Sequence, residues 1–211
     1  MKATERLIGL VESRGVAKTA WFVASRLLRY QDELLYAAEP AACGVPFVAD
    51  AVTLVTVDAA NIDRALPGPV HRQLFTGEGR SYHGGIGRGD LAFVLLDGSG
   101  ALLHHSFVQF AVRTKRLLGE AEEVPLIAHC ITVPAARGRQ LYPRALRHIM
   151  HALASAGHRR VAINCDFDNH PSIHGIERAG FLRVARLRSL IVANRWCIQM
   201  RSPGGLRICA L

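Results

Sequence analysis

The sequence predicts a mixed α/β domain in which β-strands and helices share the 211 residues. Short apolar runs rich in β-branched residues recur along the chain, and between several of them apolar residues repeat at helical spacing. Half of the residues are apolar and a fifth are charged, so the chain can bury a core. It has no internal repeat, linker or low-complexity tract, and we therefore expect one domain over residues 1–211.

Residues 1–50 are expected to form a helical N-terminal extension followed by the first strand. Apolar residues recur at helical spacing over residues 2–30, and Gly15 divides this stripe into two parts. Residues 32–38 are expected to be a strand. Residues 39–50 contain two prolines and a glycine, which indicates a loop.

The next forty residues carry weaker signals. Residues 51–57 form a β-rich run, and Asp58 can cap a short helix that Pro67 ends. A second short helix is expected over residues 70–75. Residues 76–90 contain so much glycine that we expect no regular element there, only a mobile or binding loop.

The second half of the chain predicts a β-hairpin and an amphipathic helix. Residues 91–96 and 101–110 are apolar runs on either side of a four-residue turn with two glycines, which indicates the hairpin. Residues 141–156 keep their apolar side chains to one side, which indicates the helix. The other elements expected here are an acidic connector over 117–123, strands over 124–133, 160–165, 182–187 and 194–200, and a short helix over 171–179.

The net charge of +9 comes almost wholly from arginine and favours an anionic ligand. The chain has no run of five basic residues and no interleaved aromatic residues, so nucleic acid is not a favoured partner. No apolar run approaches the ~18 residues that span a membrane, and the N-terminal run is shorter than a secretory signal. We therefore expect no membrane partner and a cytoplasmic location.

The five cysteines predict buried, reduced thiols rather than disulfides or a metal site. They are odd in number and never occur as CxxC, and two of them lie inside strand-like runs. They are Cys43, Cys130, Cys165, Cys197 and Cys209.

The basic segment RGRQLY at residues 137–142 lies between a predicted strand and a predicted helix. A turn that presents backbone N–H groups at a helix N-terminus can bind phosphate. About thirty residues later come Asn169 and Ser172, followed by Gly180 and Phe181.

Residues 132–142 resemble the acetyl-CoA pyrophosphate loop of the GNAT superfamily of N-acetyltransferases, written Q/R-x-x-G-x-G/A. Asn169 and Ser172 match the family's later N-x-x-A/S, which leads to the Gly-Phe pair. The resemblance covers residues 91–200 well and the first ninety residues only loosely. The two halves of the motif at this spacing are much more specific than either one alone.

This resemblance implies a mixed, mostly antiparallel central sheet with helices on both faces. It also implies that a β-bulge splays the fourth and fifth strands, and that the pantetheine arm of acetyl-CoA pairs with the exposed strand edge. Acetyl-CoA would be a co-substrate and no metal is implied. The positions matched to cofactor binding are Cys130, Ile131, Thr132, Arg137, Gly138, Arg139, Gln140, Leu141, Tyr142, Asn169 and Ser172.

The sequence departs from the family loop at two positions. Gln140 stands where the first motif glycine belongs, and Tyr142 where the second glycine or alanine belongs. If position 140 needs a positive φ, the glutamine strains the turn; if not, its N–H can still donate. The alternative reading is that the turn caps a helix and binds nothing.

The usual catalytic positions of the family are also altered. The implied reaction is direct attack of an amine on the thioester, helped by a base and by an acid for the leaving thiolate. The common acid position holds Ile176, and the common base positions hold Leu126 and Ala128. The remaining candidates are His104, His105, His129 and Tyr142.

Among these candidates we select His129, His105 and Tyr142 as catalytic. Histidine titrates near neutrality and can act as a base directly or through water. His104 and His105 are consecutive on one strand, so their side chains point to opposite faces and only one can face a cleft. Ser172 is expected to start a helix and contact the cofactor instead.

The sequence therefore predicts a GNAT-type N-acetyltransferase that moves an acetyl group from acetyl-CoA to a primary amine. The expected acceptor is a small molecule such as an amino sugar or an amino acid derivative. A protein amine is the enzymatic alternative, and a non-catalytic protein that binds CoA or nucleic acid is the other. The glycine-rich residues 84–89 would form a wall of the acceptor site or a plain surface loop, and a homodimer is left open.

Overall fold

The computed structural model describes residues 16, 27–40, 52–111 and 114–210. The chain divides into two compact units. We call Leu34–Ala185 the core unit, and Met1–Glu33 with Arg186–Leu211 the terminal unit. Strands β1 (Leu28–Ala38) and β7 (Leu182–Val192) contribute residues to both units. The expectation of one domain stays a prediction.

The sheet of the core unit is mixed and mostly antiparallel, as predicted. Its strand order is β2-β3-β4-β5-β6-β1-β7. The pairs from β2 to β5 are antiparallel, whereas β5 and β6 are parallel. The strands are β1 Leu28–Ala38, β2 Val52–Val57, β3 Leu91–Asp97, β4 Leu102–Gln109, β5 Leu126–Thr132, β6 Val161–Asp166 and β7 Leu182–Val192.

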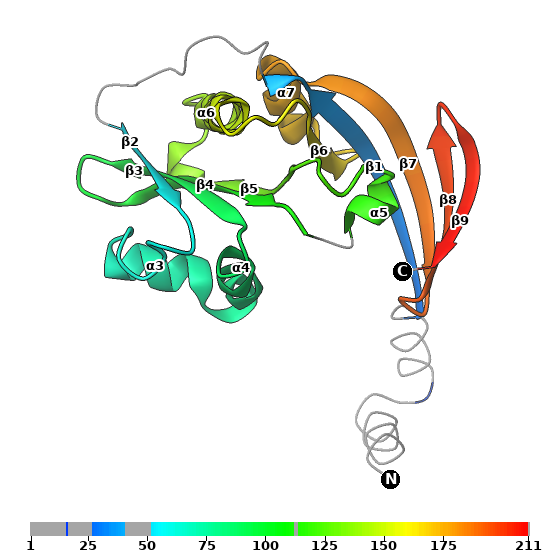
Figure 1. Cartoon of the computed structure of the whole chain (residues 1–211), viewed down its shortest axis with the longest axis horizontal. Coiled ribbons are helices and arrows are strands. Elements are labelled where there is room, and N and C mark those ends of the chain that lie inside the picture. The colour runs from blue at the N-terminus through cyan, green and yellow to red at the C-terminus, as the bar shows by residue number, and fades with distance from the viewer. Residues whose placement is uncertain (1–15, 17–26, 41–51, 112–113, 211) are drawn as a thin grey trace. The chain divides into compact units, whose positions relative to one another are not determined.

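Helices cover both faces of this sheet. Figure 1 shows α6 and α7 on one face and α3 and α4 on the other. The helices are α3 Gly68–Phe75, α4 Arg80–Ile86, α5 Thr114–Leu118, α6 Leu141–Ser155 and α7 His170–Arg178, with 3₁₀ turns η2 Gly77–Gly79 and η3 Pro134–Ala136. None of the helices in the described ranges is long and apolar enough to cross a membrane.

Each face of the sheet has its own apolar core. Leu146, Ile149 and Met150 of α6 are fully buried in the first, together with Phe93 and Ile127 from the sheet. The second lies around α3 and α4 and includes buried apolar residues of β3 and β4. The predicted apolar side of helix 141–156 is thus confirmed as the side that packs on the sheet.

The expectation of a loop over residues 76–90 is wrong, because this segment contains α4. Two of its glycines permit close packing. A Cβ at Gly79 would lie 1.9 Å from the carbonyl oxygen of Leu74, and one at Gly85 would lie 2.6 Å from Oδ2 of Asp90. Glycine here allows close approach, so its abundance did not mean a lack of regular structure.

Residues 58–66 form successive turns, so the short helix expected there is also wrong. The side chains of Asp58 and Asn61 bond the local backbone instead. Asp58 accepts from the N–H groups of Ala60 and Asn61, and the Asn61 amide donates to Thr56 O. Such bonds compete with helix formation.

Three further boundaries differ from expectation. The acidic connector expected over 117–123 begins inside α5, and residues 28–30, expected to be helical, belong to β1. The last predicted strand is followed by another, β9, which we did not predict. Residues 16 and 27 are helical as expected, while the rest of the expected N-terminal helix and most of the 39–50 loop lie outside the described residues.

The terminal unit contains strands in the order β1-β7-β8-β9. Strand β8 spans Trp196–Ser202 and β9 spans Gly205–Ala210, and both pairings from β7 to β9 are antiparallel. Leu206 and Ile208 of β9 are both 65% exposed. Without a buried face, β9 lacks the alternating pattern by which strands are recognised in a sequence.

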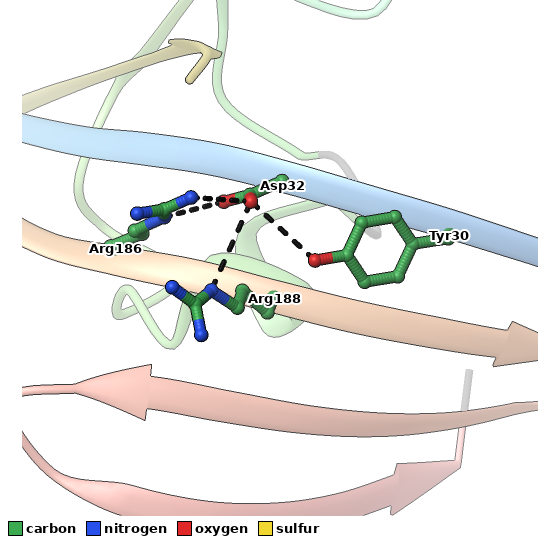
Figure 2. A network of polar contacts seen from close by, with 4 residues as sticks. All are labelled: Tyr30, Asp32, Arg186 and Arg188. Carbon is green, nitrogen blue, oxygen red and sulfur yellow. Dashed lines mark hydrogen bonds and ion pairs between the residues drawn. The ribbon is translucent and has the colours of Figure 1, made fainter. Parts of the chain in front are cut away.

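Asp32 is the centre of a polar network in the terminal unit (Figure 2). Its carboxylate accepts two hydrogen bonds from Arg186, at 2.8 and 2.7 Å, and lies 3.9 Å from Nε of Arg188. The hydroxyl of Tyr30 donates a further bond at 3.4 Å. The Arg186 hydrogen bonds are the main cause that lowers the pKa of Asp32.

We expect Asp32→Asn to lower the free energy of unfolding by about 1–2 kcal/mol at pH 7, because it breaks a bidentate, partly buried ion pair. The folded pKa of Asp32 is depressed, so this contribution is present above its unfolded pKa of about 3.9 and is lost as pH falls through the folded value. Urea unfolding at pH 7 and pH 3 measures it. Asp168→Asn, at an exposed carboxylate, is the control. Equal stability of both variants at pH 7 would contradict this role.

A cavity at the start of helix α6

A cavity of about 570 Å³ lies in the core unit, where the end of β5 meets the starts of α6 and α7. Every position matched to cofactor binding lines it except Arg139. The charge of Arg139 acts instead on Asp97 in the hairpin turn, whose pKa is lowered first by a hydrogen bond from Ser99 and also by this arginine. Segments more than forty residues apart in the sequence thus converge on one space.

The turn before α6 is built to present backbone N–H groups. Gly138 has φ +78° and Gln140 has φ 57°, so the chain passes twice through left-handed conformations before Leu141 begins the helix. No side chain of the residues that the structure describes caps this end, and its first turn contains no acidic residue. The first N–H groups of a helix lack intrahelical partners, so this end attracts anions.

The structure answers the question left open by Gln140, because position 140 does adopt a positive φ. A left-handed conformation costs a residue with a Cβ about 1–2 kcal/mol. The glutamine therefore strains the turn, while its N–H keeps its place at the helix start.

We expect Gln140→Gly to raise the free energy of unfolding by about 1 kcal/mol, because glycine removes this strain. The greater conformational entropy of glycine in the unfolded chain offsets part of this stabilisation. Urea unfolding of Gln140→Gly and of Gln140→Ala measures it. Alanine also removes the glutamine side chain but keeps the Cβ, so Gln140→Ala should leave stability nearly unchanged. Equal effects of the two substitutions would show that the backbone at this position is not strained.

Strand β5 separates from β6 as it approaches the cavity. Its register with β6 is confined to Leu126–Ala162 and Ile127–Ile163. On the other side the β4–β5 register shifts between His105 and Phe107, and His129 has φ 51°. A bulge therefore precedes Cys130–Thr132, and these residues line the cavity where β5 separates from β6. Pairing of a pantetheine arm with this edge stays a prediction.

Asn169 sets the start of α7. Its Oδ1 accepts the N–H of Ser172 at 3.2 Å, so Asn169 is the N-cap of this helix and Ser172 lies in its first turn. The amide nitrogen of Asn169 still carries two N–H donors. Both residues line the cavity.

Tyr142 lies against α7 because residue 175 is a glycine. A Cβ at Gly175 would lie 2.3 Å from Cδ1 of Tyr142. Burial, and after it Cys130 and Cys165, raises the pKa of Tyr142 far above its ordinary value, so the phenol stays protonated. Sequence reasoning missed Gly175; a glycine inside a helix costs about 1 kcal/mol, which was the available signal of a close approach. It also missed His174 and Arg178, which line the cavity too.

Cys130 is a partly buried thiol on the cavity wall. Burial raises its pKa to about 11, although hydrogen bonds with Ser106 and Tyr142 act in the opposite direction. The thiol therefore stays protonated at neutral pH and is a poor nucleophile.

His104 is fully buried and holds Thr132, which lines the cavity, in position. Its Nδ1 lies 2.8 Å from Oγ1 of Thr132, and its Nε2 lies 2.8 Å from Oγ of Ser106. Burial is the main cause that lowers the pKa of His104 to about 3, and the nearby His105 lowers it further. This ring is neutral in the folded protein and ties β4 to the end of β5.

His105 and His129 lie near one another, outside the wall of the cavity. Burial, and then the charge of His129, lowers the pKa of His105 to about 4. His129 is exposed on the bulge, 5.6 Å from His105 between ring centroids, and stacks on Tyr82 of α4 at 4.8 Å. Of the three catalytic candidates, only Tyr142 lines the cavity; His129 is the residue next to Cys130.

A second cavity of about 360 Å³ adjoins Tyr82. Its wall includes Gly85, Arg88 and Asp90, from and just after α4. The glycine-rich segment 84–89 therefore borders a cavity, and its role as a wall of the acceptor site stays a prediction.

Comparisons with known proteins show the fold. No family model and no curated protein matches the sequence. A GNAT-family acetyltransferase from Colwellia psychrerythraea is 13% identical, with a TM-score of 0.51 over 77% of this chain and 57% of its own. A tandem GNAT protein from the clavulanic acid biosynthesis pathway is 20% identical, with a TM-score of 0.50 over 81% and 55%. A GCN5-related N-acetyltransferase from Sphaerobacter thermophilus is 13% identical, with a TM-score of 0.50 over 84% and 56%.

The chain spans less than three fifths of the length of each of these three proteins. At these identities the likeness concerns the fold alone.

Proposed function

We propose that this GNAT-fold chain transfers an acetyl group from acetyl-CoA to the primary amine of a small molecule. One observation carries the proposal: the uncapped start of α6, the free edge of β5 and the Asn169 side chain all border the same 570 Å³ cavity. An anion site next to an open strand edge suits a ligand with a pyrophosphate at one end and an amide-containing arm at the other.

The pyrophosphate and the pantetheine arm of acetyl-CoA each have matching groups in this chain. The pyrophosphate would accept hydrogen bonds from the N–H groups between Gly138 and Tyr142, with Arg137 adding a charged contact. The pantetheine amides would pair with the edge of Cys130–Thr132, and the Asn169 amide would bond the same arm. The thioester would then lie near the bulge at His129.

The proposed chemistry is direct transfer. The amine nitrogen attacks the thioester carbonyl, loses a proton to a base or to water, and the C–S bond breaks to release the thiolate. His129 is the proposed base because it is exposed beside this position. Tyr142, which stays protonated, would donate a hydrogen bond to the leaving sulfur. The high pKa of Cys130 argues against an acyl-enzyme intermediate.

The second cavity supports an amino acid derivative as the acceptor. Arg88 and Asp90 on its wall offer opposite charges, which matches a small molecule that carries both a carboxylate and an amine. A protein amine is the enzymatic alternative.

A second candidate function is binding of CoA without turnover. It is favoured by the apolar residues at the usual acid and base positions, of which Ile176 is completely buried. The low pKa values of His104 and His105 also make these rings weak bases.

The test is acetyl-CoA turnover with a panel of amines, followed through the release of free thiol. Transfer above the uncatalysed rate in the wild type, and its loss in Asn169→Ala, is the expected result. CoA affinity without transfer to any amine would support the second candidate. A salt-dependent affinity for nucleic acid, with no affinity for CoA, would refute both.

A further inference from the structure

Three potential metal ligands lie together in the core unit, away from the cavity at α6. Asp63 belongs to the turns before α3, His71 to α3 and His83 to α4. One ligand atom of each residue lies within 4.8 Å of those of the other two. Nε2 of His83 lies 3.8 Å from Oδ1 of Asp63.

The ring of His71 provides an independent observation. Its Nε2 is buried and has no hydrogen-bond partner among the described residues. A buried polar atom without a partner is rare in folded proteins and calls for an explanation. A cation held together with His83 and Asp63 would satisfy it.

Phe75 forms an apolar wall beside the two histidines. Its ring centroid lies 5.0 Å from that of His71 and 5.4 Å from that of His83, edge to face in both cases. Asp63 is 86% exposed, so an ion could enter there and complete its coordination with water. A low-dielectric wall strengthens the attraction between a cation and the carboxylate.

We propose that Asp63, His71 and His83 bind a zinc ion or a similar divalent transition-metal ion. Two imidazole nitrogens and one carboxylate oxygen suit zinc, whereas magnesium and calcium prefer oxygen ligands alone. Tetrahedral zinc with bonds of about 2.0–2.1 Å needs ligand atoms roughly 3.4 Å apart. Small side-chain rotations would therefore close the site. The proposal does not depend on acyl transfer.

Such an ion would join the turns before α3 to both helices on this face. Tyr82, the residue before His83, stacks on His129 at the bulge. Metal binding is therefore expected to stabilise the layer that covers the proposed base.

The test uses the full chain without an affinity tag, freed of metal by dialysis against a chelator. Zinc is titrated in competition with a chromogenic chelator, and thermal unfolding is followed with zinc and with magnesium. We expect one zinc ion per chain and a rise in melting temperature with zinc only. His71→Ala and His83→Ala should each weaken zinc binding by roughly 100-fold or more. His151→Ala, at an exposed histidine of α6, should bind zinc like the wild type.

A second variant separates the loss of a zinc ligand from misfolding of the protein. His83 is 42% exposed, so His83→Gln should fold normally, as circular dichroism would show, and still lose zinc affinity. Zinc binding that persists in His71→Ala and His83→Gln would overturn the proposal and direct attention to Cys197 and Cys209, which face each other across β8 and β9. Absence of zinc binding in the wild type would overturn it as well.

Discussion

Gly138→Leu is expected to weaken acetyl-CoA binding by at least about 100-fold. The residue lines the cavity with φ +78°, and no atom of the described residues beyond its chain neighbours lies within 4 Å of the Cβ that a substitution would add. A leucine side chain would therefore extend into open space beside the turn, where the pyrophosphate is proposed to bind, and would strain the backbone that presents the N–H groups. Hydrogen bonds to a charged group contribute about 1.5–3 kcal/mol each, so losing two of them accounts for this factor. Isothermal titration with acetyl-CoA measures the change.

Gly157→Leu is the matched control for this experiment. Gly157 follows the C-cap of α6 with φ +85°, and a Cβ added there would likewise meet no described atom within 4 Å, but Gly157 does not line the cavity. The two substitutions should therefore cost similar stability, and only Gly138→Leu should lose the cofactor. Unchanged acetyl-CoA affinity in Gly138→Leu would show that this turn does not hold the pyrophosphate.

Acid is expected to destabilise the protein between about pH 6.5 and pH 4. Burial lowers the pKa of His104 to about 3 and that of His105 to about 4, whereas an unfolded histidine titrates near 6.5. In this window the unfolded chain binds protons that the folded chain does not. The free energy of unfolding therefore falls as pH falls, by up to about 1.4 kcal/mol per pH unit for each ring.

His105→Leu tests the origin of this pH dependence. Within the described part of the chain the buried Nδ1 of His105 has no hydrogen-bond partner, so an apolar residue can replace the ring without leaving another polar group unpaired. Urea unfolding at several pH values from 4.5 to 7 should show a shallower slope than in the wild type, by about one proton. His151→Leu, at an exposed position, should keep the wild-type slope. Identical slopes for His105→Leu and the wild type would contradict the buried, neutral state of this ring.

The elements that the sequence predicted well carry their own local signals. The hairpin was predictable because its turn is stabilised locally by Asp97, whose carboxylate accepts hydrogen bonds from the N–H groups of Ser99 and Ala101. Helix α6 follows from the spacing of its apolar residues. By contrast, the role of Gly79 and Gly85 depends on the partners that they approach, Leu74 and Asp90, which a local pattern does not reveal. For this reason α4 was mistaken for a loop.

The backbone segments that form the candidate site were predictable from the sequence, whereas the contacts and burial of its side chains were less so. The motif around Gly138 and the N-cap Asn169 identified segments that the fold brings to one cavity. The contact between Tyr142 and Gly175 depends on how α7 packs beside α6, and the burial of His104 depends on the β4–β5 register. Such features arise only after the elements have assembled, so they could not be predicted from spacing alone.

The most direct test of the acetyl-CoA site is thermal unfolding of the wild type with acetyl-CoA, with CoA and with heparin as a polyanion control. A ligand present at 100 times its dissociation constant stabilises the folded state by about 2.7 kcal/mol, which is a clear rise in melting temperature. We expect both CoA species to raise the melting temperature more than heparin does. A rise with heparin alone, or no rise with any of the three, would contradict the cofactor site at the start of α6.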